Sequence, residues 1–169
     1  QETYDRLLAV RNRLEDEPFG VASYVAGLAA FNRGAFGDAL SALARVPDGT
    51  AYAYPARYLS AACHSNLNND DSAMAVYYRL VSGPANQERD PVLQRIWNNA
   101  RLKLGLIYYE RGENRREITL FNQVDDDFQK DDLTLLARAW SAYRSGRPVE
   151  ALRNTETLLT QTLFSGYQY

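Results

Sequence analysis

The segment Gly34-Ala35-Phe36-Gly37-Asp38-Ala39-Leu40 is the most informative part of this 169-residue chain, because a similar segment occurs three more times. A helix can end at a glycine, which adopts the left-handed conformation without a side-chain penalty, and a second helix can follow at once. The returning segments begin at Asn68, Gly112 and Gly146, so the turn residues are 34, 44 and 34 residues apart. Asparagine also tolerates the left-handed conformation. The spacing therefore predicts four helix-turn-helix hairpins.

Helical periodicity surrounds the first turn. Apolar residues recur three and four positions apart on both sides of Gly34, which is the pattern of a helix with one apolar face. They are Val21, Tyr24, Val25, Leu28 and Phe31 before the turn, and Ala39, Leu40, Leu43 and Val46 after it. Strand signals are absent from the sequence, so we expect an all-α protein.

Small residues keep the same register as the turns. The residues that lie seven positions before the four turns are Gly27, Ala61, Gly105 and Ala139. The residues that lie five positions after the turns are Ala39, Ala73, Glu117 and Ala151. Small side chains let the two helices of a hairpin approach closely, because the side chains at a crossing set the interaxial distance. Glu117 is the exception, and either a looser crossing or an outward-pointing carboxylate would accommodate it.

These hairpins resemble the tetratricopeptide repeat, a 34-residue helix-turn-helix unit with a Leu-Gly pair and a tyrosine in the first helix and an alanine and an aromatic in the second. The third hairpin is nearest to this pattern, with Leu104-Gly105, Tyr108, Gly112 and Phe121. The first keeps Gly27, Gly34, Phe36 and Ala39, and the second departs most, with His64 where a tyrosine is usual. The resemblance implies a right-handed superhelical solenoid of antiparallel helix hairpins.

The register divides the chain into four repeats, at residues 20–53, 54–81, 92–131 and 132–165. Residues 82–91 contain two prolines, a glycine and polar side chains, and we interpret them as an insertion loop. Pro91 can open the next helix, because proline at the first helical position loses no hydrogen bond. We expect residues 1–19 to form an N-terminal helix, either a cap or a half repeat, and residues 166–169 to be the truncated start of a further helix.

Composition excludes several classes of protein. Nineteen basic and 21 acidic residues leave a net charge of −2, which offers no electrostatic footprint for nucleic acid. The chain has no run of about 18 uncharged apolar residues, so we expect no membrane span. A single cysteine, Cys63, excludes an internal disulfide and a cysteine-based zinc cluster.

Candidate catalytic and metal sites are weak. Cys63 and His64 are neighbours on a predicted helix, where adjacent side chains do not face each other, so we interpret them as a core thiol and a substituted tyrosine. Two candidate metal-binding segments are Asp125-Asp126-Asp127 with Asp131-Asp132, and Asn68-Asn69-Asp70-Asp71. Both lack the alternating carboxylates, central glycine and terminal glutamate of a calcium loop. Arg111, Arg115 and Arg116 alternate with glutamates and predict a solvated, salt-bridged face. We therefore expect no enzyme activity, no cofactor and no metal.

The resemblance also implies a binding surface, since the first helices of successive repeats line the concave face of such a solenoid. The residues expected on this face are Tyr24, Phe31, Asn32, Tyr58, Asn66, Leu102, Tyr109, Trp140, Tyr143 and Arg144. Tyrosine and tryptophan combine a rigid apolar body with a polar tip and are frequent at binding hot spots. The alternative is that several of these aromatic side chains only pack between repeats.

Two functions follow from the resemblance. The first is a non-enzymatic protein–protein interaction scaffold that binds a peptide or helix of a partner in its concave groove. The alternative is a structural spacer within a longer superhelix of a multi-domain bacterial protein, whose open ends could also bring two copies together. The connection at 46–53 is loosely similar to those of bacterial cell-envelope members of the family, which favours the periplasm or envelope over the cytoplasm and leaves the compartment open.

Overall fold

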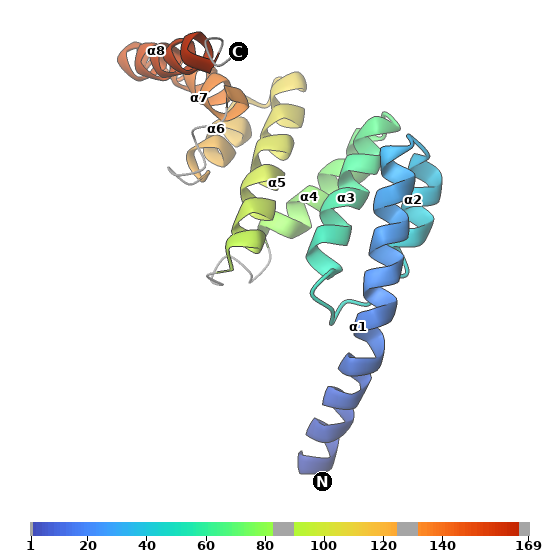
Figure 1. The fold of residues 1–169 in the computed structure, drawn as a ribbon. Coiled ribbons are helices and arrows are strands. Elements are labelled where there is room, and N and C mark those ends of the chain that lie inside the picture. The colour runs from blue at the N-terminus through green and yellow to red at the C-terminus, as the bar shows by residue number, and fades with distance from the viewer. Residues whose placement is uncertain (1, 83–89, 125–131, 166–169) are drawn as a thin grey trace. The chain divides into compact units, whose positions relative to one another are not determined.

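The computed structural model describes residues 2–82, 90–124 and 132–165, which form eight α-helices (Figure 1). The helices are α1 (Glu2–Asn32), α2 (Phe36–Leu43), α3 (Ala53–Asn66), α4 (Asp70–Ser82), α5 (Pro91–Glu110), α6 (Asn114–Asn122), α7 (Asp132–Arg144) and α8 (Pro148–Ser165). No strand occurs among these residues, so the all-α prediction is confirmed.

Consecutive helices pair as hairpins, with α1 on α2, α3 on α4, α5 on α6 and α7 on α8. The chain divides into two compact units, Gln1–Pro84 and Ala85–Tyr169, each with two hairpins. Within the first unit α2 and α1 also contact α3, and within the second α6 and α5 contact α7. The superhelical path expected for all four hairpins stays a prediction.

All four predicted turns adopt the left-handed conformation. Their φ angles are 76° at Gly34, 55° at Asn68, 74° at Gly112 and 72° at Gly146. In each turn the next backbone N–H donates to a carbonyl five residues earlier, as from Ala35 to Ala30 at 3.0 Å. This hydrogen bond is the six-to-one bond of a Schellman motif, which satisfies a carbonyl that the helix end leaves free. The turn prediction is confirmed at every position.

The close helix crossings are also confirmed. A Cβ atom on Gly27 would lie 2.6 Å from the Leu43 side chain, and one on Gly105 would lie 2.5 Å from the ring of Phe121. Ala39, Ala61 and Ala73 are fully buried at the corresponding positions of the register. These small residues therefore let the facing helix insert a larger side chain.

The first unit has an N-terminal helix that differs from our expectation. α1 continues without a break from Glu2 to Asn32 and contains Pro18, so residues 2–19 are the first part of a longer helix. Proline removes one helical hydrogen bond, but the residues beside it are held in place. Glu17 Oε1 accepts a hydrogen bond from the Ala51 backbone N–H at 3.3 Å, and Gly20 packs against Thr50. Contacts with the α2–α3 connection thus support the helix on both sides of Pro18.

The core of the first unit joins α1, α2 and α3. Its buried residues are Ala30, Ala39, Leu43, Ala56, Leu59 and Cys63. The Cys63 side chain is fully buried, and this burial raises the pKa of its thiol. A buried thiol with a raised pKa is a poor nucleophile, which agrees with its interpretation as a core residue.

The core of the second unit joins α5, α6 and α7 through Leu102, Phe121, Val124 and Ala137. α5 begins at Pro91 as predicted, and the Asp90 carboxylate caps it by accepting a hydrogen bond from the Val92 N–H at 2.8 Å. Most of the predicted insertion loop, the acidic run at 125–127 and residues 166–169 lie outside the described residues.

Candidate functional site

Three aromatic rings and one guanidinium group meet in the second unit. The rings of Tyr109 on α5 and Trp140 on α7 contact edge to face, with centroids 6.2 Å apart. Trp140 and Tyr143 lie one helical turn apart and stack at 5.9 Å. The Arg144 guanidinium lies 5.5 Å from the centroid of the Tyr109 ring. We call Tyr109, Trp140, Tyr143 and Arg144 the aromatic cluster.

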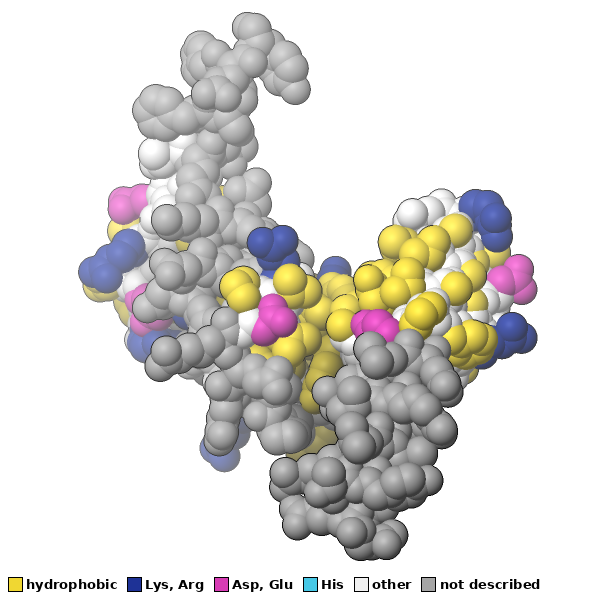
Figure 2. Space-filling model, turned by 60° about the horizontal axis from the view of Figure 1, so that its bottom comes forward, with side chains coloured by type: hydrophobic (Ala, Val, Ile, Leu, Met, Phe, Trp, Pro, Cys, Tyr) yellow, Lys and Arg dark blue, Asp and Glu magenta, His cyan; other side chains and the backbone are white. Residues whose placement is uncertain are grey.

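The aromatic cluster is accessible from outside. Trp140 is 45% exposed and Tyr143 is 65% exposed, although each ring is held by its neighbours. Such large aromatic side chains are usually buried in a folded domain. Figure 2 shows hydrophobic side chains reaching the surface between charged ones on one face of the molecule. The cluster is thus an exposed, largely aromatic surface.

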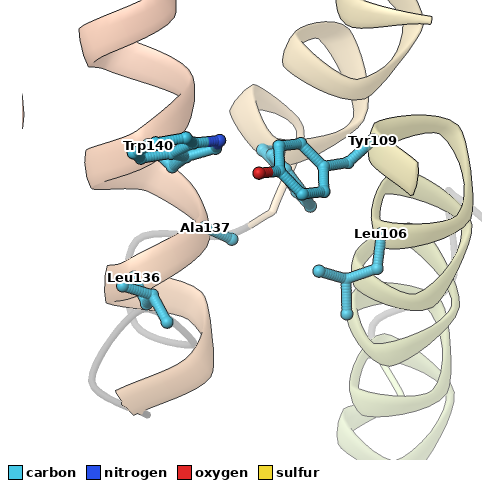
Figure 3. Close-up of a pocket in the computed structure, with 6 residues that line it drawn as sticks. Leu106, Tyr109, Leu136, Ala137 and Trp140 are labelled. Carbon is cyan, nitrogen blue, oxygen red and sulfur yellow. The ribbon is translucent and has the colours of Figure 1, made fainter. Parts of the chain in front are cut away.

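A cavity of about 250 Å³ lies beside the cluster, between α5, α6 and α7. It is lined by Leu106, Tyr109, Phe121, Leu136, Ala137 and Trp140. Figure 3 shows Leu106 and Tyr109 extending from α5 toward the Ala137 and Trp140 side of α7. The lining carries no charged residue, and the cavity is smaller than the roughly 300–1,000 Å³ of small-molecule sites. It therefore suits one large apolar side chain of a partner.

Glu117 on α6 contacts the aromatic cluster through Arg144. Its side chain is fully buried, and its Oε2 lies 3.5 Å from Arg144 Nη1. Burial raises the pKa of the Glu117 carboxyl, while the positive charge of Arg144 acts in the opposite direction. The other oxygen, Oε1, is buried without a hydrogen-bond partner among the described residues. The pair fixes the guanidinium between a carboxylate and the Tyr109 ring.

This position excludes one of the two alternatives for Glu117. The carboxylate does not point outward, and it does not belong to the solvated face around Arg111, Arg115 and Arg116. On that face Arg116 pairs instead with Glu113, at 2.8 Å. In the sequence, Glu117 stands out only because it occupies a position where the other repeats have alanine. The register could not predict that Arg144 is its partner.

The candidate residues of the first unit are partly structural. Tyr24 and Phe31 pack against the core of α1, α2 and α3, and each contacts a second ring at 5.4 Å, Tyr52 and Phe36 respectively. Asn32, at the end of α1, is exposed. Core packing thus accounts for much of the two aromatic side chains, and Asn32 keeps a free surface.

The second hairpin of the first unit contributes two further candidates. Tyr58 is half-buried with its ring 5.9 Å from that of Tyr77, and burial raises the pKa of the Tyr58 phenol. Asn66 is exposed, and its side-chain Nδ2 donates to the Ala62 carbonyl of its own helix at 2.8 Å. The Asn66 amide would have to leave this bond to donate to a peptide.

Leu102 differs from the other candidates. It is 2% exposed and belongs to the core that α7 covers, so it does not present a surface to a partner. Leu136 holds the same position of the register 34 residues later and is 55% exposed. The difference arises because α7 packs over the first of these leucines, whereas no described helix follows α8.

Metal and membrane sites do not add to these candidates. No three His, Cys, Asp or Glu side chains in residues 2–82, 90–124 and 132–165 gather in a way that could hold a metal ion. In the same part of the chain, every helix is too short or too polar to cross a membrane.

Comparison with known proteins leaves the family open. No protein-family model matches the chain, and no curated protein matches its sequence. Among solved structures the chain is similar to that of a mutant of MamA, with 16% identity and a TM-score of 0.37. The superposition covers 83% of this chain and 96% of that chain.

Proposed function

We propose that the four hairpins are tetratricopeptide-type repeats and that the protein is a non-enzymatic module that binds a segment of a partner protein. The observation that carries this proposal is the exposed aromatic cluster beside the apolar cavity. Hot spots of protein interfaces are enriched in tryptophan, tyrosine and arginine, and the cluster combines all three types. The proposed site is built by the second unit.

The geometry favours a partner with one large apolar anchor. The cavity provides a desolvated pocket for a leucine-sized or aromatic side chain, and Trp140 forms one wall of it. Because Trp140 is held by Tyr109 and Tyr143, little side-chain entropy is lost on binding. Arg144 is partly neutralised by Glu117, so we expect shape and apolar contact to contribute more than charge.

The proposal is tested by selecting peptides from a random display library on the purified chain and measuring their affinity by calorimetry. We expect selected peptides to share an apolar or aromatic anchor. Replacing Trp140 with alanine should weaken their binding by about 2 kcal/mol, roughly 30-fold, as expected for a hot spot. The melting temperature should change little, because nearly half of the Trp140 side chain is exposed.

Tyr78→Ala is the matched control, since Tyr78 is another large exposed aromatic side chain, on α4 of the other unit. This variant should bind the selected peptides like the unmodified protein. A large drop in melting temperature for Trp140→Ala would assign Trp140 to the core instead. Failure to select any peptide that Trp140→Ala weakens would favour the alternative function, a structural spacer in a longer helical array.

A further inference from the structure

A second apolar groove lies between α7 and α8, on the side that no described helix covers. Its volume is about 370 Å³, and its lining includes Leu136, Ala139, Tyr143, Ala151, Leu152 and Thr155. Leu152 is 61% exposed, and none of the lining residues is charged. An uncharged groove of this kind excludes a strongly charged ligand but fits the apolar face of a helix.

The repeat register shows what this groove is shaped to hold. The residues 34 positions earlier lie in the groove between α5 and α6, and that groove is occupied by α7. There Ala137 of α7 packs with Leu102 and Phe121, and Arg144 of α7 pairs with Glu117. The α7–α8 groove is therefore equivalent in the register to the α5–α6 groove, which already binds a helix, α7.

Two differences between the grooves define the helix that would fit. Ala151 stands where the α5–α6 groove has Glu117, so the incoming helix needs no arginine at the position of Arg144. Thr155 stands where that groove has Phe121. The smaller threonine leaves room for a side chain larger than Ala137 on the incoming helix.

The first helix of the same chain meets both requirements. In the register, 112 residues before α7, α1 has Val25 at the position of Ala137 and Asn32 at the position of Arg144. Val25 is 55% exposed, and Ala22, Ala26, Ala29 and Asn32 are exposed beside it. In α7 the equivalent residues Thr134, Ala137 and Ser141 are buried. The outer face of α1 is thus a helix face of the α7 type without a described partner.

We infer that two copies of this chain associate head to tail, with α1 of one copy seated in the α7–α8 groove of the other. The two halves of the contact are different surfaces, so each copy keeps one free half and further copies can add. The contact continues the arrangement by which α7 sits on α5 and α6. Because the groove lining and the facing positions of α1 are uncharged, we expect salt to have little effect on the association.

Sedimentation velocity of the whole chain over a series of concentrations tests the inference. The average mass should rise above the 19.1 kDa of the monomer with concentration. Val25→Glu and Leu152→Glu should each raise the dissociation constant about tenfold or more, because each would bury an unpaired carboxylate. Both positions are exposed in one copy alone, so circular dichroism should show folded protein for both variants.

Mixing the two variants gives the sharpest result. Val25→Glu keeps an intact groove and Leu152→Glu keeps an intact α1 face, so a mixture should form dimers that cannot grow further. Val149→Glu is the matched control on α8, since Val149 is 72% exposed and does not line the groove; it should associate like the unmodified chain.

Three results would overturn the inference: an unmodified chain that stays monomeric at every concentration, association that Val25→Glu leaves intact, or a mixture of the two variants that stays monomeric. Trp140 and Tyr143 of the aromatic cluster also line this groove, so peptide binding is measured on Val25→Glu, which keeps the groove and the cluster but should not associate with itself. Peptide binding by this variant tests the proposed function whichever of these results is obtained.

Discussion

A glycine in the first helix of the third hairpin controls how closely α5 and α6 approach. Gly105 faces the ring of Phe121, and a Cβ atom there would lie 2.5 Å from it. Phe121 is itself 2% exposed and packs with Leu102, Val124 and Ala137, so the ring could move away from Gly105 only by leaving these contacts for the cavity that it lines. A single methyl group at residue 105 would therefore strain the core of the second unit.

We expect Gly105→Ala to lower the free energy of unfolding by about 1–3 kcal/mol, the usual cost of overpacking a dense core. Chemical denaturation measures the change. Gly37→Ala is the control, because Gly37 lies in α2 where an added methyl group would meet no atom within 4 Å, and alanine is the better helix former there. Equal destabilisation by both substitutions would contradict the tight crossing.

At the scale of elements, the contact between Glu117 and Arg144 joins α6 to α7. The raised pKa of Glu117 means that the folded protein binds a proton at this carboxyl more tightly than the unfolded chain does. The stabilising contribution of the protonated group is complete below the ordinary glutamate pKa of about 4.3 and is lost as the pH rises through the raised value. Ionisation of Glu117 thus lowers the free energy of unfolding.

Glu117→Gln removes this titration. Relative to the unmodified protein, the variant should gain stability as the pH rises from about 4 to about 7, because only the unmodified protein must bury a carboxylate in that range. Urea denaturation at several pH values measures the difference. Glu113→Gln serves as the control, since the Glu113 and Arg116 pair is exposed. A difference between Glu117→Gln and the unmodified protein that stays constant with pH would contradict this account.

On the scale of the whole molecule, stability accumulates through contacts between neighbouring helices. Each hairpin in a repeat protein buries only part of its apolar surface alone, and the hairpin next to it in the same unit buries more. α3 and α5 contain many of the buried residues, such as Leu59, Trp97 and Leu104. Among the described helices, α1 contacts α2 and α3, and α8 contacts α7.

Hydrogen exchange of the monomer at low concentration should therefore be fastest toward the two ends, in the first half of α1 and in α8 from Leu158 onward. Amides in α3 and α5 should exchange more slowly. Each additional 1.4 kcal/mol of local stability slows exchange by about tenfold. Mass spectrometry of peptic fragments measures these rates. Uniform protection along the chain would indicate one cooperative globule rather than a repeat array.

The hairpins could be predicted from local sequence patterns. The left-handed turns at Gly34, Asn68, Gly112 and Gly146 and the small residues around them depend on local backbone geometry, which a register of short segments reveals. Pro91 as the first residue of a helix follows from the same local chemistry. These features could be predicted because they need no knowledge of what lies beyond the neighbouring turn.

Packing between helices, which the repeat register does not reveal, determines which residues of one register position are buried. Leu102 is covered by α7 and Leu136 is exposed, although both hold the same place in their repeats. Glu117 has its partner on a different hairpin, and contacts with the α2–α3 connection allow α1 to continue through Pro18. The burial of a residue depends on which helix packs against it. That contact is formed by residues far apart in the sequence, so it cannot be predicted from one repeat alone.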